Sequence, residues 1–229
     1  MTKPRLVVFT GSGISAESGI ATFRDEGGVW DNYDVQEVCS TEALYKNRSL
    51  VFDFFNAAHK AMTKVQPNAA HFEIAALEEH FNVTVVTQNI DDLHERAGST
   101  KVIHLHGEIT KMRDIHTEEI VPRLEGDLDP QSTWRPHVVM FGEMPYNFDE
   151  AEELCEEAHY GMVVGTSLAV YPAAMLAYRF QITTPVILVD PNPPLDGRTF
   201  PNIVVVKEDA TSGVALAANL LLVEIAKGQ

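Results

Sequence analysis

A short apolar run at residues 6–9 leads directly into a glycine-rich turn, and this junction constrains the fold more than any other feature. The glycines have the spacing G-x-G-x-x-A within the sequence Thr10-Gly11-Ser12-Gly13-Ile14-Ser15-Ala16. A strand, a glycine turn and a helix start in this order present backbone N–H groups to a phosphate, because glycine permits close approach. The junction therefore predicts a dinucleotide-binding turn on a parallel sheet, although many tight strand-to-helix turns also contain two glycines.

Further apolar runs of similar length recur along the chain, at residues 83–86, 102–105, 162–164, 186–189 and 203–206. Their hydrophobic residues are continuous rather than alternating, which is typical of strands in a parallel sheet that is covered on both faces. Helical patterns lie between them, at residues 68–80, 149–158 and 169–180. Strands that alternate with helices predict an α/β fold with a doubly wound, Rossmann-like parallel sheet.

Two segments depart from this alternation. Residues 25–64 are rich in aromatic side chains and predict a small helical module, whereas residues 111–134 are polar and predict a loop with little core of its own. We therefore expect a single domain over residues 1–229 with two parts. The Rossmann-like part comprises about 1–27, 65–110 and 135–229, and the smaller module comprises about 28–64 and 111–134.

The composition restricts the partners and the compartment. A formal net charge of −16 argues against nucleic acid or an anionic membrane as the main partner, because both repel an acidic surface. Cys39 and Cys155 are the only cysteines, too few for a disulfide framework or a cysteine-rich zinc site. With no apparent signal peptide and an apolar stretch at 214–223 that is too short to span a bilayer, we expect a cytoplasmic protein. No feature indicates an oligomeric state.

Polar residues follow the predicted strand at 83–86, in the sequence Gln88-Asn89-Ile90-Asp91. Ligands of open parallel sheets bind at the carboxyl ends of the strands, where amides and carboxylates can contact sugar hydroxyls and a carboxamide. The alternative is ordinary turn chemistry, since Asn and Asp favour turns. The pattern alone fits either interpretation.

His106 follows the predicted strand at 102–105, and a histidine aimed at the same crevice can act as a general base. For an isolated histidine a structural role is the more common one, and His104, two residues earlier on the same strand face, is the candidate for that role. A second small-residue turn, Gly165-Thr166-Ser167, follows the strand at 162–164 and can hold a ribose or phosphate. Three such strand ends at one edge favour a ligand site over three independent caps.

A dehydrogenase places an acidic residue about 20 positions after the glycine turn, at the end of a second strand. This chain has no strand there. A nicotinamide cofactor would therefore be held differently from the cofactor of a dehydrogenase.

At this point a family resemblance becomes visible. The chain resembles the sirtuins, NAD-dependent protein-lysine deacylases, and most closely their short bacterial members. The matching motifs occur in family order from end to end. They are Gly11-Ser12-Gly13-Ile14-Ser15 through Gly19, Thr22-Phe23-Arg24, Pro67-Asn68-Ala69-Ala70-His71, Thr87-Gln88-Asn89-Ile90-Asp91, His106-Gly107-Glu108, Arg135 through Glu143, and Gly165-Thr166-Ser167 with Val170-Tyr171-Pro172-Ala173.

The resemblance implies an NAD site and a role for each motif. His106 is the implied general base, and Asn89 and Asp91 complete the implied catalytic set. The implied NAD contacts are Gly11, Ser12, Gly13 and Ser15 at the phosphates, Phe23 and Arg24 over the nicotinamide ribose, Gln88 and Asn89 at that ribose, Ile90 and Asp91 at the carboxamide, Gly165, Thr166 and Ser167 at the adenosine, Asp190 or Asn192 at its ribose, and Asp209 and Ala210 at the adenine.

The implied substrate is an acylated lysine in a protein or peptide. The segment Val139 to Glu143, with Phe141 and Gly142, is expected to offer backbone groups to an extended peptide, as in strand addition. Phe55 is expected beside the acyl group. The products implied by the family chemistry are nicotinamide, free lysine and O-acyl-ADP-ribose.

The chain departs from the family in two places. Four zinc-binding cysteines are expected after the His-Gly pair, and none is present. Asp114 stands where the first is expected and could form a substitute site with His116, Glu118 and Glu119, but a solvated loop is the favoured interpretation and we expect no metal.

The second departure concerns the acyl group. Bacterial relatives that prefer acidic acyl groups carry Tyr and Arg three residues apart, and here Phe55 and Ala58 occupy these positions. Without the guanidinium, a succinyl or malonyl carboxylate would lose its charge partner, so we expect an uncharged acyl group such as acetyl or a longer aliphatic chain.

The leading hypothesis is therefore an NAD-dependent lysine deacylase. The alternatives are an NAD glycohydrolase or ADP-ribosyltransferase that uses the same pocket, and a catalytically weak NAD-binding regulator.

Overall fold

The computed structural model describes residues 2–22, 33–195 and 201–227, and its centre is a parallel sheet of six strands. The strands lie in the order β3-β2-β1-β7-β8-β9, and every neighbouring pair is parallel. Their bounds are β1 Arg5–Thr10, β2 Asn82–Thr87, β3 Val102–His104, β7 Tyr160–Val164, β8 Val186–Val189 and β9 Ile203–Val206. The predicted α/β fold and its six strands are confirmed.

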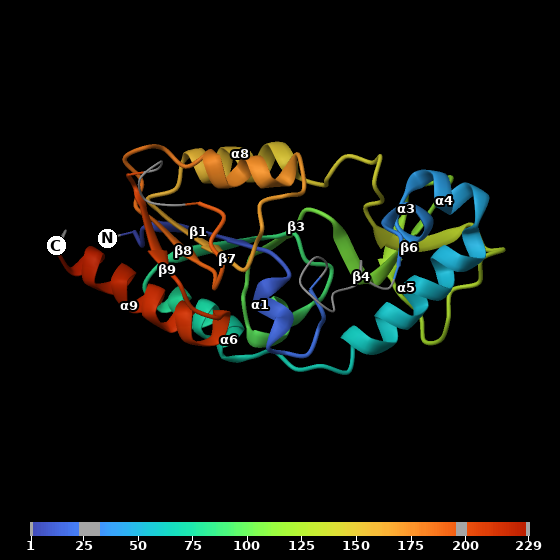
Figure 1. The fold of residues 1–229 in the computed structure, drawn as a ribbon, viewed down its shortest axis with the longest axis horizontal. Helices are drawn as coiled ribbons and strands as arrows, with labels where there is room; N and C mark the ends of the chain where they lie inside the picture. The colour runs from blue at the N-terminus through green and yellow to red at the C-terminus, as the bar shows by residue number, and fades with distance from the viewer. Residues whose placement is uncertain (1, 23–32, 196–200, 228–229) are drawn as a thin grey trace.

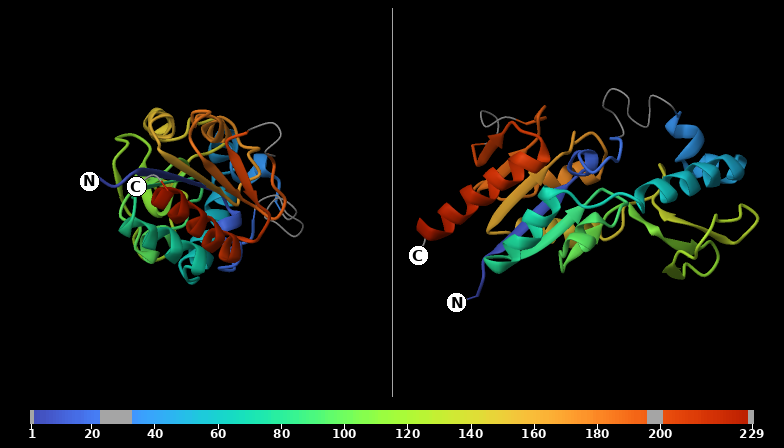
Figure 2. Two further views of the ribbon diagram at one scale, coloured as in Figure 1. Left: turned by 90° about the vertical axis from the view of Figure 1, so that its left-hand side faces the viewer. Right: turned by 90° about the horizontal axis from the view of Figure 1, so that it is seen from below.

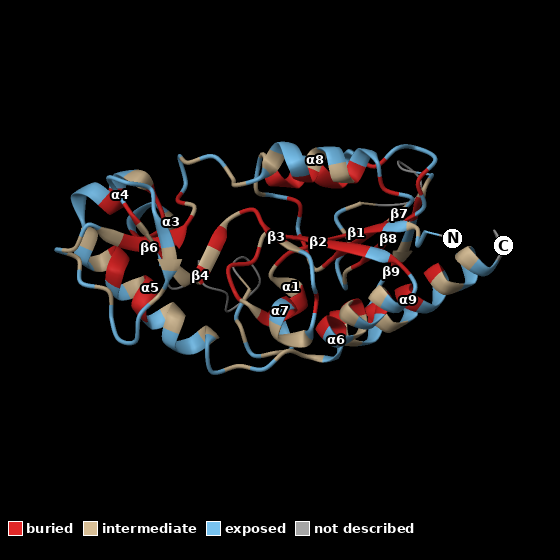
Figure 3. Ribbon diagram, turned by 180° about the vertical axis from the view of Figure 1, so that it is seen from behind, coloured by how far each residue is buried: buried red, intermediate tan, exposed pale blue. Residues whose placement is uncertain are grey.

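Helices cover both faces of this sheet, as Figures 1 and 2 show. On one face lie α1 (Gly13–Ala16), α6 (Ala69–Ala76) and α9 (Ala210–Lys227), packed on alternate residues of β1 such as Leu6 and Val8. On the other face, α8 (Phe148–Glu156) and the 3₁₀ helix η2 (Ala173–Tyr178) pack on Val7 and Phe9. The burial colours of Figure 3 show the result: the strands are buried along most of their length, because both faces are covered.

The second part of the molecule lies at the end opposite the two termini (Figure 1). It combines helices from the first half of the chain with a three-stranded antiparallel sheet of order β5-β4-β6. The bounds are α3 Val35–Val38, α4 Thr41–Lys46, α5 Arg48–Met62, β4 Gly107–Asp114, β5 Ile120–Pro122 and β6 Trp134–Val138. Its core includes Val51, Phe52 and Phe55 of α5, together with Ile109 of β4 and Met140. The helices η1 (Leu77–Glu79) and α7 (Leu93–Ala97) belong to the Rossmann-like part.

Two expectations need correction. The segment 111–134 is not a loop, because β4 runs to Asp114 and pairs with β5 and β6, so the expected boundaries near 110 and 135 fall inside strands. The helix expected over 169–180 is only the 3₁₀ turn η2. Pro172 lies inside that range, and a proline disfavours helical geometry in the residue before it and removes one N–H donor.

Side chains of α5 bind the backbone of the 123–132 segment and hold it against the small module. The buried Asn56 donates to the Leu128 carbonyl at 3.1 Å, and its Oδ1 accepts from the Leu128 N–H at 3.0 Å and from Arg123. Arg48 donates to the Pro130 carbonyl at 2.8 Å. These bonds fix the position of residues 123–132, which lie where the family that the sequence resembles carries its zinc-binding cysteines.

Among the described residues, no helix has the length and hydrophobicity needed to cross a membrane.

Candidate active site

A cleft of about 550 Å³ opens at the carboxyl ends of β1, β2 and β7 and extends to the small module. Sheet order reverses at β1, whose neighbours are β2 on one side and β7 on the other, so β1 and β7 form the topological switch point. Crevices of open α/β sheets form at such points. Three turns from separate parts of the chain therefore meet at one edge of the sheet, as the sequence predicted.

The turns after β1 and β7 are packed backbone against backbone. The Gly11 N–H donates to the Val164 carbonyl at 3.0 Å, and the Gly13 N–H donates to the Gly165 carbonyl at 2.9 Å. A Cβ on Gly11 would lie 2.7 Å from the Gly165 oxygen, and one on Gly13 would lie 2.6 Å from the Gly165 Cα. Both glycines are thus required for contact between the two turns, and of the two only Gly11 lines the cleft.

The loop after β2 is held on several sides. The Asn89 side chain donates to the Gly11 carbonyl at 3.1 Å and to the Ser15 hydroxyl at 3.2 Å, while the Gln88 amide donates to the Thr166 hydroxyl at 2.9 Å. One loop therefore bridges both glycine turns. Gln88, Asn89 and Ile90 all line the cleft.

Asp91 lies behind the cleft lining and is buried. Its carboxylate accepts from the Ser15 hydroxyl at 3.0 Å and from the Leu93 N–H at 3.2 Å. Burial raises the pKa of Asp91, and these two hydrogen bonds partly oppose the increase. Ser15 and Asp91 thus form a second layer beneath Asn89.

His106 has the geometry of a general base. Its Nδ1 lies 2.9 Å from the Gln88 carbonyl, which can only accept, so Nδ1 carries a proton, and in the neutral ring Nε2 then keeps its lone pair. In the described part of the chain Nε2 has no hydrogen-bond partner, and the residue lines the cleft. Burial lowers the pKa of His106, so the ring is neutral near pH 7 and able to accept a proton.

The segment after β6 forms another wall and is braced from beneath. Arg135, which is buried, donates to both carboxylate oxygens of Glu143 at 2.6 and 3.1 Å, and Glu143 accepts from the Met140 N–H at 2.8 Å. The N–H groups of Val139 and Phe141 donate to the carbonyls of His106 and Cys39. Among residues 139–143, Gly142 alone has a backbone N–H that donates to no other group in the described structure, so a peptide here would rely on that group and on carbonyl oxygens.

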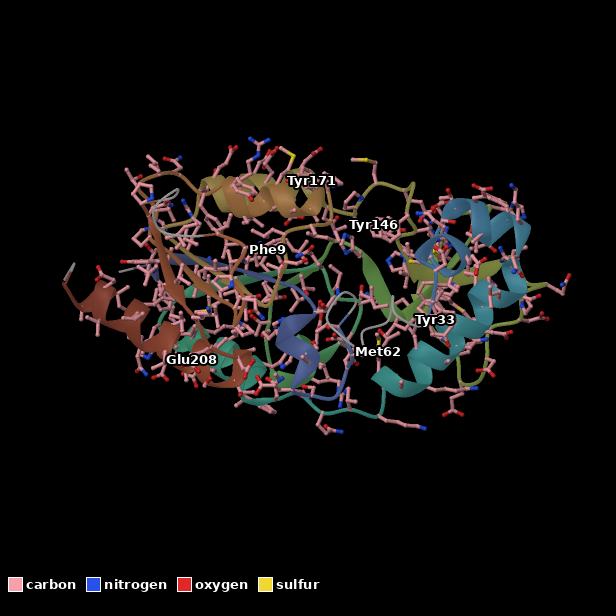
Figure 4. All side chains as sticks on the ribbon, viewed as in Figure 1. Phe9, Tyr33, Met62, Tyr146, Tyr171 and Glu208 are labelled. Atoms are coloured by element: carbon pink, nitrogen blue, oxygen red, sulfur yellow. The ribbon has the colours of Figure 1, made fainter. Side chains whose placement is uncertain are left out.

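The far side of the cleft is apolar. Its lining there comes largely from one face of α5 and from neighbouring residues: Ile20, Ala21, Tyr33, Phe54, Phe55, Ala57, Ala58, Ala61, Met62 and Val65. In Figure 4, Tyr33 and Met62 lie at the α5 side of the cleft and Tyr171 lies across from them, toward α8. Among the described lining residues Glu143 is the only carboxylate, and neither lysine nor arginine is present.

Most of the predicted residues lie together. Gly11, Ser12, Phe55, Val139, Phe141, Gly142, Gly165, Thr166 and Ser167 line the cleft with the residues already named. Asp190 and Asn192 follow β8, where the Asp190 carboxylate accepts from the Asn192 N–H at 2.8 Å. Asp209 and Ala210 stand at the start of α9, and these four residues do not line the cleft. Phe23 and Arg24 lie outside the described residues.

The sequence prediction missed most of the apolar wall. Phe54, Ala57, Ala61 and Met62 line the cleft from α5, and the spacing of three and four residues between Phe54, Ala57 and Ala61 was the available signal. Cys39 also lines the cleft, and burial raises the pKa of its thiol to about 12. Its environment therefore keeps the thiol protonated and unreactive.

Asp114 organises a turn. Its carboxylate accepts from the N–H groups of His116 and Thr117 at 2.9 and 3.0 Å and from the Thr133 hydroxyl at 2.5 Å. These hydrogen bonds lower the pKa of Asp114 to about 2, and the bond from Thr133 makes the largest contribution. Among the residues that the structure describes, no three histidine, cysteine or acidic side chains form a metal-binding group.

Comparison with known proteins identifies the family. A sequence profile of the Sir2 family matches residues 11–172. The chain belongs to the Sir2 family. It is 43% identical over 229 residues to an NAD-dependent protein deacylase of Bacteroides thetaiotaomicron, with 95% of this chain and 97% of that protein covered.

Solved Sir2 structures have the same fold. A mutant Sir2 homologue in complex with ADP-ribose matches with a TM-score of 0.87 and 31% identity, covering 98% of this chain and 94% of that one. A Sir2 protein with a deacetylated p53 peptide and 3′-O-acetyl-ADP-ribose matches with a TM-score of 0.80 and 30% identity, covering 93% and 92%. The recognised family and the sheet architecture are therefore confirmed.

Proposed function

We propose that this Sir2 protein is an NAD-dependent protein-lysine deacylase that forms nicotinamide, free lysine and O-acyl-ADP-ribose. The observation that carries the proposal is the placement of His106, whose Nδ1 lies 2.9 Å from the Gln88 carbonyl and which lines the cleft together with Asn89. The names of the curated relatives support the same activity.

The residues present fit NAD. A cleft of about 550 Å³ lies within the range of roughly 300–1,000 Å³ that small-molecule sites occupy. The N–H groups of Gly11, Gly13 and Gly165 already donate within the protein, whereas those of Ser12, Thr166 and Ser167 have no acceptor among the described residues. These three N–H groups, the hydroxyls of Ser12 and Ser167, and the side-chain oxygen atoms of Gln88 and Asn89 provide donors and acceptors for phosphates, ribose hydroxyls and a carboxamide. The single lining carboxylate, Glu143, is paired with Arg135, so it offers little repulsion to a pyrophosphate.

When bound, NAD supplies an electrophilic ribose carbon that loses nicotinamide. The chain positions the groups around it. Asn89 is fixed through its side chain and its backbone, which leaves Oδ1 as its open acceptor. Nε2 of His106 takes a proton from a ribose hydroxyl, and a positioned base of this kind is typically worth about 10²–10⁴-fold in rate.

We assign the peptide site to the wall formed by residues 139–143, where Gly142 and the carbonyl oxygens are available. This wall lies directly beside His106, since the Val139 N–H donates to the His106 carbonyl at 2.9 Å. The brace from Arg135 through Glu143 keeps it in place. A lysine that enters here brings its acyl group toward the apolar wall of α5.

We further propose that the acyl group is uncharged, so that this protein is a deacetylase, or removes longer aliphatic groups, rather than a desuccinylase. Phe55 is buried and Ala58 lines the cleft, and the described lining contains no cation to pair with an acyl carboxylate. Burying an unpaired carboxylate carries a large desolvation cost. The cytoplasmic location stays a prediction from the sequence.

Release of nicotinamide tests the function. Purified protein is incubated with NAD, with and without matched acetyl-lysine, succinyl-lysine and unmodified peptides, and nicotinamide is quantified by chromatography. Release that requires the acetyl peptide is the expected result. Equal release without peptide would instead indicate an NAD glycohydrolase, and NAD binding without release would indicate a regulator.

A further inference from the structure

His104 lies two residues before His106, and the two imidazoles bind adjacent carbonyls of the same loop. Nδ1 of His106 lies 2.9 Å from the Gln88 oxygen, and Nδ1 of His104 lies 3.0 Å from the Asn89 oxygen. The third carbonyl in the row, that of Ile90, accepts from the Ile109 N–H at 2.8 Å. Three successive carbonyls of the loop that carries Asn89 are therefore held by β3, β4 and the residues between them.

The two histidines differ at Nε2. That of His106 is open to the cleft, whereas that of His104 lies 2.8 Å from the Glu95 carboxylate on α7. A peptide carbonyl and an ionised carboxylate can only accept hydrogen bonds. Both ring nitrogens of His104 must therefore donate, which requires the doubly protonated imidazolium.

We propose that His104 is a positioning residue for the proposed deacylation, held as an imidazolium between Asn89 and Glu95, where it fixes the catalytic loop to β3 and α7. The proposal rests on the proposed function for its effect on turnover. The protonation state that it assigns is a property of the free protein and can be measured without substrate.

The electrostatic surroundings agree with this assignment. Burial lowers the pKa of His104, but the hydrogen bond and charge of Glu95, the charge of Glu108 on β4 and the Asn89 carbonyl outweigh that effect and raise it. Glu95 remains ionised because the hydrogen bond and charge of His104 overcome its own burial and lower its pKa. The other ionisable groups that respond to His104 are Asp91, whose pKa it lowers, and His94, which burial keeps neutral.

His104 is the exception among the buried histidines. Burial is the leading cause that lowers the pKa of His71, His94, His106 and His137. A positive charge on His104, and on none of these other four histidines, therefore needs an explanation, and the two hydrogen-bond acceptors of His104 provide it. Hydrogen bonds from a charged donor are shorter and about twice as strong as neutral ones, which suits a loop that must present Asn89 reproducibly.

The first measurement is nuclear magnetic resonance of the wild-type protein labelled with ¹⁵N in its histidine rings. At neutral pH, His104 is expected to carry protons on both ring nitrogens, whereas His106 carries one. In Glu95→Gln, whose side-chain amide can donate to a neutral ring, His104 is expected to lose one proton at the same pH. A wild-type His104 with one unprotonated nitrogen would overturn the proposal.

The second measurement uses a matched pair of substitutions. The amide nitrogen of Asn can replace Nδ1, and that of Gln can replace Nε2. His104→Asn should therefore keep the bond to Asn89 and most of the turnover, whereas His104→Gln should lower kcat for nicotinamide release by about tenfold, as expected for one charge-assisted hydrogen bond. KM for the acyl peptide should change little in either variant, because the hydrogen bonds that His104 makes in the described structure go to Asn89 and Glu95, outside the 139–143 wall.

A carboxylate outside the network provides the control. Glu78 accepts from the Thr100 N–H and hydroxyl just before β3, so Glu78→Gln removes a comparable surface charge without contact to His104. It should change neither the His104 protonation nor kcat. Equal kcat in the two His104 variants, or a higher value in His104→Gln, would refute the positioning role. Wild-type protein that releases no nicotinamide would refute the proposed deacylase instead, while the resonance measurement would still decide the protonation of His104.

Discussion

Introducing a guanidinium on α5 should convert this protein into a desuccinylase. Phe55 and Ala58 lie three residues apart on the face of α5 that lines the cleft. We expect the double variant Phe55→Tyr, Ala58→Arg to gain activity on a succinyl-lysine peptide and to lose part of its activity on the acetyl peptide. The arginine would supply the only cation among the described lining residues.

The size of the gain follows from the position of Ala58, which is half-buried at the edge of the cleft. Two unit charges about 4 Å apart attract by about 4 kcal/mol at an effective dielectric constant of roughly 20. Ordering the arginine side chain costs about 2 kcal/mol of rotamer entropy. The remaining ~2 kcal/mol corresponds to about a 30-fold increase in kcat/KM for the succinyl peptide, given tenfold per 1.4 kcal/mol.

The assay compares kcat/KM for succinyl and acetyl peptides of identical sequence, measured as nicotinamide release. Ala58→Met is the control, because it adds length without charge and should depress activity on both peptides alike. Two results would refute the reasoning. One is wild-type protein that removes succinyl as fast as acetyl, and the other is an arginine variant whose preference is unchanged.

Three further predictions concern the base, the small module and the cleft thiol. His106→Ala should lower kcat by about 10²–10⁴-fold. Because burial lowers the pKa of His106, the neutral form that acts as the base persists below pH 6.5. The acidic limb of the wild-type pH–activity profile that reports this ring should therefore lie below pH 6.5, and the profile of the variant should lack it. Asn56→Ala should reduce the free energy of unfolding, measured by urea denaturation, by about 2–3 kcal/mol, because it removes buried hydrogen bonds to Leu128 and Arg123. The control Lys60→Ala breaks an exposed ion pair with Asp127 and should reduce the free energy of unfolding by less than about 1 kcal/mol. Cys39 should resist iodoacetamide at pH 8, because its thiol pKa is about 12, and rapid alkylation detected by mass spectrometry would contradict that environment.

The sheet was predictable from the sequence, whereas the small module was not. Continuous apolar runs such as 186–189 have no polar face, so a doubly covered parallel strand is the natural interpretation. In β4, by contrast, Lys111 and Arg113 pair with Glu108 and Glu118. These charged residues make the segment resemble a loop, and only the pairing with β5 and β6 shows that it is a strand.

The sequence predicted many of the residues that form the site, but it predicted fewer of the contacts that connect them. Strand-end motifs placed Gln88, Asn89 and His106 at one edge, because carboxyl ends of parallel strands meet there. Sequence reasoning assigned His104 a structural role without a partner, since Glu95 lies on a different element and the Asn89 carbonyl carries no sequence signal. The glycines illustrate the same limit: their Cβ positions are occupied by Gly165, which is distant in sequence.

The loop 88–91 joins the Rossmann-like part to the small module. Its first residues contact the glycine turns through Gln88 and Asn89, while Ile90 packs in the small-module core with Ile109 and Val138. A shift of that core would therefore move the loop that lines the cleft. The wall to which we assign the peptide is built on the same core through Met140, so the proposed peptide site and the loop share one set of packed side chains. The hydrogen bonds from His104, His106 and Ile109 to the loop carbonyls therefore hold the loop in one position relative to both parts of the molecule.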